Sequence, residues 1–259
     1  MKPKTLRAIH ANVGVEVAYR KSLREILNEI HADVLSEIVV EYSVYEAEIA
    51  QDINIALVMQ KLFERMTGRW QCRLDDLGLQ VAKIFAKGAT SHTERAMMQA
   101  FKRAGFTVRF SMSERVEQET EGVIGENVGL IKSIGNQYLE DVQQSVWQAI
   151  KAGHDMHTLS KTLHTKYEIS KRRADFIARD QNNKAKAVIE RERRLEIGIT
   201  KAIWQHSRVG KKPRISHVHA NGKEFDIEQG MYIDGEWIQP GELINCRCTS
   251  RAVIPGFNS

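Results

Sequence analysis

The spacing of proline constrains the fold of this chain more than any other feature of its sequence. The 259 residues contain four prolines, and none lies between Pro3 and Pro213, whereas Pro240 and Pro255 follow within the last fifth. Proline breaks helices, so the long interval without it permits uninterrupted helices. With 42% hydrophobic and 27% charged residues, the chain can bury a core and is not expected to be disordered. The pattern predicts a helical body and a change of structure near residue 200.

The N-terminal part has the periodicity of amphipathic helices. Apolar residues recur every three or four positions, which places them on one helical face, at Tyr19, Leu23, Ile26, Leu27, Ile30, Val34 and Ile38. Similar patterns predict helices at about 54–66, 70–86 and 90–103. Residues 1–120 are therefore predicted to form a helical N-terminal region, in which the apolar stripe is a packing surface.

Helical patterns continue to about residue 195. One helix with its apolar face between Leu139 and Ile150 should end at Gly153, and a short helix is expected around 156–163. Ser170 can then cap a long basic helix over 170–195.

The C-terminal part has short alternating runs separated by turn dipeptides. Asn221-Gly222 separates 215–220 from 223–227, and Asp234-Gly235 separates 231–233 from 236–238. Both dipeptides favour the type I′ turns of two-residue hairpins, whose central residues need positive φ. The predicted fold class is α+β, with a long helical N-terminal region followed by a small antiparallel β-hairpin module.

The net charge of +5 is unevenly distributed. Residues 161–214 contain 16 Lys and Arg against 6 Asp and Glu, an excess of ten, so the remainder carries −5. Such a basic segment attracts polyanions through phosphate contacts. The alternative is a solvated helix face with ion pairs such as Lys186 with Glu190. The candidate DNA-binding residues are Arg172, Arg173, Arg179, Lys184, Lys186, Arg193, Arg194, Lys211, Lys212 and Arg214.

The densest group of reactive side chains comprises His217, His219, Cys246 and Cys248. On a strand, residues two apart face the same side, so each pair would point together. Two imidazoles and two thiolates form a tetrahedral Zn²⁺ site, and structural zinc is therefore the candidate cofactor. Cys-x-Cys is a weaker zinc signal than Cys-x-x-Cys. The alternatives are reduced, buried cysteines beside ordinary polar histidines, or a redox Cys-x-Cys pair.

The same residue types allow an enzyme hypothesis. His217 or His219 could act as a base, with Cys246, Cys248 or Ser216 as nucleophile and Arg214 binding an anion. A nuclease-like site would add Glu224 or Glu242 as an acid. However, the sequence contains no phosphate-binding Gly loop, no Gly-x-Ser-x-Gly and no His-Glu-x-x-His. A non-enzymatic protein without a small-molecule substrate is therefore the favoured interpretation.

The cysteine count and hydropathy bear on the compartment. Three cysteines, an odd number, do not indicate a disulfide framework, and the chain starts without the apolar run of a signal peptide. No apolar run approaches the ~18 residues of a membrane span. We expect synthesis in a reducing cytoplasm and no membrane partner.

An ordered set of motifs runs through residues 125–252. It consists of Tyr167–Gln181, Gly198-Ile199, Trp204–Ser207, Arg214–His217, Asn221–Phe225 and Pro240–Cys248. Together these motifs resemble the phage Mu F-like minor head protein family, a family of phage head morphogenesis proteins. The resemblance assigns residues 121–259 to a Mu F-like domain, composed of the basic helix 170–195 and a β-rich module at 197–252.

The resemblance implies a structural function in a phage or prophage. The chain would be a minor capsid protein of the virion, located in the head interior, that acts in procapsid assembly. Its implied partners are the portal protein, scaffold or capsid proteins, and packaged DNA. The alternatives are a nuclease-like enzyme that uses His217, Cys246 and Cys248, and a nucleic-acid-binding protein of the host.

The family pattern maps onto particular residues of the β-rich module. These are Arg214, His217, Gly222, Pro240, Gly241, Cys246 and Cys248. His219 lies outside the pattern, which weakens the four-ligand zinc site and leaves its fourth ligand unassigned. Where the family often has Asp-Arg-x-Arg before the histidine, this chain has Val209-Gly-Lys-Lys-Pro-Arg214, which removes an acid.

Overall fold

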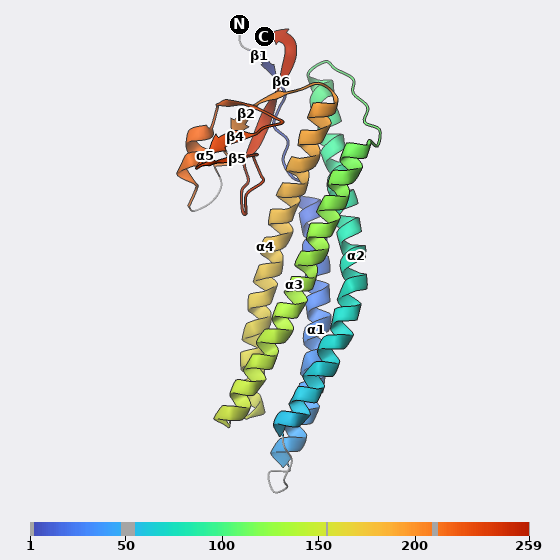
Figure 1. Ribbon diagram of the computed structural model, residues 1–259, viewed down its shortest axis with the longest axis vertical. Coiled ribbons are helices and arrows are strands. Elements are labelled where there is room, and N and C mark those ends of the chain that lie inside the picture. Colours follow the sequence, from blue (N-terminus) through green and yellow to red (C-terminus); the bar gives the residue numbers. More distant parts are fainter. Residues whose placement is uncertain (1–2, 48–54, 154, 209–211, 259) are drawn as a thin grey trace. The chain divides into compact units, whose positions relative to one another are not determined.

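A computed structural model describes residues 3–47, 55–153, 155–208 and 212–258 (Figure 1). The chain divides into two compact units that are not consecutive in sequence. The helical unit comprises Ala18–Ala82 and Gly125–Ala178, and the mixed unit comprises Met1–Val17, Lys83–Ile124 and Arg179–Ser259. The sequence-based prediction divides the chain at residue 120, a boundary that does not coincide with the limits of these two units. Among the described residues, no helix is both long and apolar enough to cross a bilayer.

Four long helices occupy the part of the sequence that lacks proline. They are α1 (Val13–Ala47), α2 (Ile55–Arg103), α3 (Glu114–Ala152) and α4 (Met156–Glu196). The helices predicted separately at 54–66, 70–86 and 90–103 form one continuous α2, and the two predicted at 156–163 and 170–195 form one α4. Glycine within a helix costs only about 1 kcal/mol relative to alanine, so Gly68, Gly78 and Gly88 do not interrupt α2. Ser170, predicted as a cap, lies buried inside α4.

The helical unit buries the predicted apolar stripe of α1. All seven residues of that stripe are buried, and Leu27, Ile30, Val34 and Ile38 have no exposed surface. Close packing of α1, α2 and α3 depends on Gly135 of α3. A Cβ atom at this position would lie 2.5 Å from Leu74 Cδ1 and 3.2 Å from Ile30 Cδ1. Only glycine fits there without displacing its neighbours.

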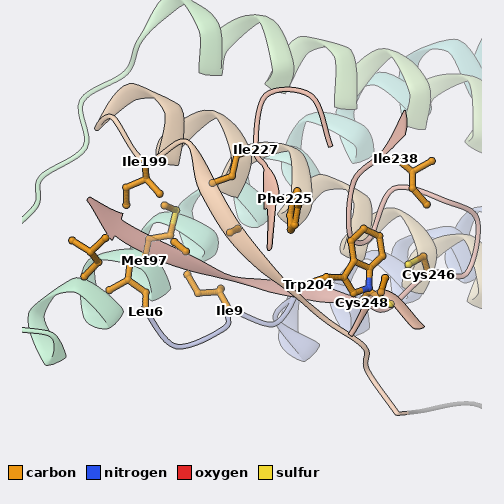
Figure 2. Close-up of a cluster of buried hydrophobic side chains, with 14 of the residues drawn as sticks. Leu6, Ile9, Met97, Ile199, Trp204, Phe225, Ile227, Ile238, Cys246 and Cys248 are labelled. Atoms are coloured by element: carbon orange, nitrogen blue, oxygen red, sulfur yellow. The ribbon is translucent and has the colours of Figure 1, made fainter. Parts of the chain in front are cut away.

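The mixed unit contains the sheet. Its four strands, in the order β1 (Pro3–Thr5), β6 (Thr249–Asn258), β2 (Lys201–Gln205) and β3 (Glu224–Asp226), are all antiparallel. A core cluster that includes Leu6, Met97, Trp204 and Phe225 joins the sheet to α2 (Figure 2). Long helices with a small antiparallel sheet near the C-terminus confirm the predicted α+β class.

One of the two predicted hairpins is present. Strands β4 (Met231–Ile233) and β5 (Glu236–Ile238) pair antiparallel around Asp234-Gly235. Both turn residues have positive φ, 54° and 91°, as a type I′ turn requires.

The prediction of a hairpin around Asn221-Gly222 is wrong. Residues Ile215–Ala220 form a short helix, α5, instead of a strand. At the Asn221-Gly222 turn that follows, only the glycine has positive φ. The Lys223 N–H donates to the Ala220 carbonyl, and Asn221 has φ −56° and ψ 125°, so the turn is type II. Asn221-Gly222 therefore connects α5 to β3 instead of joining two strands.

We predict that Gly135→Ala destabilises the protein by about 1–3 kcal/mol, because the new methyl group would overlap Leu74. Gly129→Ala is the matched control, since Gly129 lies in α3 with no neighbouring atom within 4 Å of the added Cβ. That control should gain up to about 1 kcal/mol from helix propensity. Urea denaturation of both variants measures the difference, and equal effects would contradict the packing argument.

Candidate functional site

His217, Cys246 and Cys248 form a buried cluster in the mixed unit. His217 comes from α5, and the two cysteines come from the segment between β5 and β6. The His217 Nδ1 atom lies 3.6 Å from the sulfur of Cys246 and 3.6 Å from that of Cys248. The potential ligand atoms of all three residues lie within 4.8 Å of one another. At most 4% of each residue is exposed.

The surrounding structure fixes each member of the cluster. Trp204 of β2 packs against the His217 ring at 5.3 Å in an edge-to-face arrangement. Trp204 and both cysteines lie at the same end of the core cluster (Figure 2). The Asn245 N–H donates to the carboxylate of Asp180 on α4, and the Cys246 N–H donates to the Leu243 carbonyl. These contacts hold the cysteine segment against α4.

Gly241 allows this segment to approach α4 closely. Its φ is +97°, which L-residues with side chains rarely adopt. An added Cβ would lie 3.1 Å from Ala187 Cβ on α4. Gly241 of the Pro240-Gly241 motif therefore allows the segment that carries the cysteines to pack closely on α4.

One of the two thiols donates a hydrogen bond to the other, and this shifts their pKa values in opposite directions. Donation from the Cys248 thiol lowers the pKa of Cys246 to about 5, aided by the backbone N–H groups of Cys248 and Gly241 and opposed by burial. The same hydrogen bond, together with burial, raises the pKa of Cys248.

His219 does not join this cluster. In the predicted strand it would face the same way as His217, but on a helix two positions differ by about 200°. His217 is accordingly buried and His219 exposed. The four-residue arrangement expected from the sequence is thus reduced to three residues.

Three of the ten candidate DNA-binding residues are buried in ion pairs. Lys186 and Arg194 both contact the carboxylate of Glu190, and Arg194 also donates to the hydroxyl and carbonyl oxygens of Ser250. Arg193 contacts Glu94 and Glu196, each through a guanidinium nitrogen. These cations lie between 2% and 4% exposed. Their charge is neutralised inside the mixed unit, which corrects their assignment to a DNA-binding surface.

The other candidate cations are distributed over both units. Arg172 and Arg173 are exposed in the helical unit, where Arg173 donates to Ser133. Arg179 and Lys184 are half-buried in the mixed unit, and Lys184 lies 3.7 Å from Asp180. Lys212 and Arg214 are exposed there, and Arg214 donates to the Ile244 carbonyl. Lys211 lies outside the described residues.

A pocket of about 530 Å³ opens beside the His-Cys cluster. His217, Cys246 and Cys248 line it, together with the cationic side chains of Lys212, Arg214 and Arg247. His206 and Ser207 contribute from the end of β2. No pattern in the sequence predicts this pocket, although the Trp204–Ser207 and Arg214–His217 motifs both contribute residues to its walls.

Glu224 and Glu242, the carboxylates proposed for a nuclease site, do not line this pocket. Among the described residues that line the pocket there is no Asp or Glu. Glu242 accepts from the Gln239 N–H, and Glu224 lies 3.1 Å from Lys201. Ser216, the candidate nucleophile, donates to Asp234. The structure brings together the histidine and cysteines of the enzyme hypothesis but not its acid.

Comparison with known proteins identifies the region that carries this site. Residues 140–251 match the sequence model described as "Phage Mu protein F like protein". This region is therefore similar to the Phage Mu F-like family. It contains the His-Cys cluster and the buried ion pairs of α4 at 186–194.

Comparisons with curated proteins and with solved structures give two further results. The chain is 34% identical over 144 residues to an uncharacterised protein of Haemophilus influenzae, a match that covers 56% of this chain. The chain spans only 30% of that relative's length. No solved structure gives a significant match.

We predict that Glu190→Gln destabilises the protein by about 3–5 kcal/mol, because Lys186 and Arg194 would keep their buried charges without a counter-ion. Glu224→Gln is the control, because it removes an exposed partner from Lys201 and should change stability by less than about 1 kcal/mol. Chemical denaturation of both variants tests this. A Glu190→Gln protein as stable as the control would mean that the buried pairs do not contribute.

Proposed function

We propose that this protein is a minor head protein of a phage or prophage that acts in procapsid assembly. Its partners in this proposal are the portal protein and scaffold or capsid proteins, and its location is the interior of the virion head. The observation that carries the proposal is the Phage Mu F-like match over residues 140–251. The match runs from the last part of α3 to the start of β6 and includes α4, α5 and the cysteine segment of the His-Cys cluster.

The character of the site favours an architectural role over catalysis. The His-Cys cluster is buried, and its residues connect α5 with the segment before β6. The carboxylates that a nuclease would use are hydrogen-bonded or ion-paired outside the pocket. Groups committed to internal contacts stabilise a fold, and they are poorly placed to act on an external substrate.

The assembly role is tested in the phage or prophage that encodes the chain. We expect the protein in purified heads, and we expect deletion of its gene to reduce the yield of DNA-filled particles. Co-purification with the portal protein from the same genome should survive high salt if the contact is largely apolar. Absence of the chain from purified particles would contradict the proposal and favour a host nucleic-acid-binding protein.

We further propose a secondary contact with packaged DNA through exposed cations of the mixed unit. Lys212 and Arg214 are the candidates, because both are exposed, whereas Lys186, Arg193 and Arg194 are buried. Each phosphate contact contributes a slope of about −0.9 to the dependence of log K on log salt. Exposed side chains with few internal partners are the ones available for such contacts.

The double variant Lys212→Gln/Arg214→Gln should bind DNA more weakly and reduce the salt slope by about 2. Lys223→Gln is the control, since Lys223 is exposed in the same unit and lies outside the candidate set. Fluorescence anisotropy with duplex DNA across a salt series measures both. An unchanged slope in the double variant would remove these two residues from the DNA contact.

The nuclease alternative has its own test. Plasmid DNA and RNA incubated with the pure protein, with and without divalent metal, should remain intact. Cleavage that is lost in His217→Ala but kept in His219→Ala would overturn the structural role. His219 is the suitable control because it is exposed on the same short helix.

A further inference from the structure

We propose that His217 Nδ1, Cys246 Sγ and Cys248 Sγ bind one Zn²⁺ ion, with a fourth coordination position open to the adjacent pocket. This inference does not depend on the proposed head function. It rests on the separation of the three ligand atoms, their burial and the elements that they connect.

Both nitrogen-to-sulfur distances match those of a tetrahedral zinc site. Zinc lies about 2.3 Å from a thiolate sulfur and about 2.0–2.1 Å from an imidazole nitrogen. At a tetrahedral angle these bond lengths place sulfur and nitrogen about 3.6 Å apart. In this structure both sulfurs lie 3.6 Å from His217 Nδ1. One ion could therefore contact all three atoms without a rearrangement of the backbone.

One nitrogen of the imidazole ring, Nδ1, faces both sulfurs. The other nitrogen of the ring, Nε2, is buried and has no hydrogen-bond partner among the described residues. The ring is thus oriented toward the sulfurs by its surroundings and not by a second polar partner. Thiolate and imidazole ligands together favour zinc over magnesium or calcium.

The site would stabilise a weak point of the fold. Helix α5 has six residues, and Arg214, the N-cap residue that precedes it, makes no side-chain capping bond. Isolated helices of this length do not persist in water, so α5 depends on tertiary contacts. A zinc ion would connect α5 to the cysteine segment, which Asn245 anchors to α4 through Asp180. Metal binding would therefore contribute directly to the stability of the mixed unit.

The fourth position is the feature that distinguishes this site from a closed structural one. Among the described residues, the ligand group consists of His217, Cys246 and Cys248 alone. All three line the pocket, which lets water or an incoming group complete the coordination. His206 lines the same pocket, and its Nδ1 accepts from the Arg208 N–H. We assign it no ligand role, a choice that the test below examines.

Elemental analysis of the full chain, purified without chelator, should give about one zinc per chain. Replacement by Co²⁺ should produce the near-ultraviolet absorption of thiolate-to-cobalt charge transfer. Loss of an outer-shell partner typically weakens metal binding about 10–100-fold, so loss of a direct ligand should cost at least about 100-fold. We expect that loss in Cys246→Ser, Cys248→Ser and His217→Ala, measured by competition with a chromophoric chelator.

Two variants that remove a thiol or an imidazole outside the cluster serve as controls. Cys72→Ser removes the exposed thiol of α2, and His219→Ala removes the exposed histidine of α5; both should retain full zinc affinity. If a ligand variant fails to fold, the wild-type chain is treated with chelator and its reactive thiols are counted before and after Zn²⁺ is restored. Zinc should then protect two of three thiols. A zinc-free folded protein without measurable affinity, unprotected thiols, or an equal loss in His206→Ala would overturn the three-ligand site.

Discussion

The mixed unit depends on one buried carboxylate, that of Glu190. Lys186 and Arg194 lie one helical turn on either side of it on α4, and both contact it. Burial lowers the pKa of the Arg194 guanidinium, and the attraction of Glu190 opposes that shift. Removing charges from water is unfavourable unless they are paired and hydrogen-bonded, and here Ser250 supplies the additional acceptors. These contacts fix α4 against the start of β6.

The position of α4 in turn determines the geometry of the His-Cys cluster. Asp180 accepts a hydrogen bond from the Asn245 N–H, and an added Cβ at Gly241 would lie only 3.1 Å from Ala187. The cysteine segment therefore follows the surface of α4 before it enters β6. Trp204 of β2 positions the imidazole from the opposite side. The cluster results from contacts between segments that are far apart in sequence.

Local signals in the sequence predicted the local structure well. The apolar stripe of α1 is buried throughout, and Asp234-Gly235 forms the expected turn. The number of helices was overestimated, because glycine lowers helix propensity only slightly and long-range packing outweighs that cost. Gly135 illustrates the reverse case, since its importance comes from Leu74 on another helix. No pattern within α3 reveals that contact.

The error at 215–220 has a similar origin. His217 and Ala220 are the buried residues of α5, whereas Ile215 and Val218 are exposed. A hydrophobicity pattern places the isoleucine and valine inside, and it therefore cannot identify the face that packs. Burial of His217 depends on Trp204 and the two cysteines, which lie outside the segment. The structure places both cysteines beside His217, whereas His219, grouped with them on residue chemistry alone, is exposed.

In the basic segment, the number of charged residues in the sequence does not show which of them are exposed. The pair Lys186–Glu190, considered as an alternative to DNA binding, is present, but it is buried instead of solvated. Once Lys186, Arg193 and Arg194 are excluded, the accessible cations of the mixed unit include Lys212 and Arg214 at the pocket. Arg247 lines the same pocket, and no described residue of its lining is acidic. The accessible positive charge therefore lies beside the His-Cys cluster, whereas the cations inside the mixed unit are neutralised by buried carboxylates.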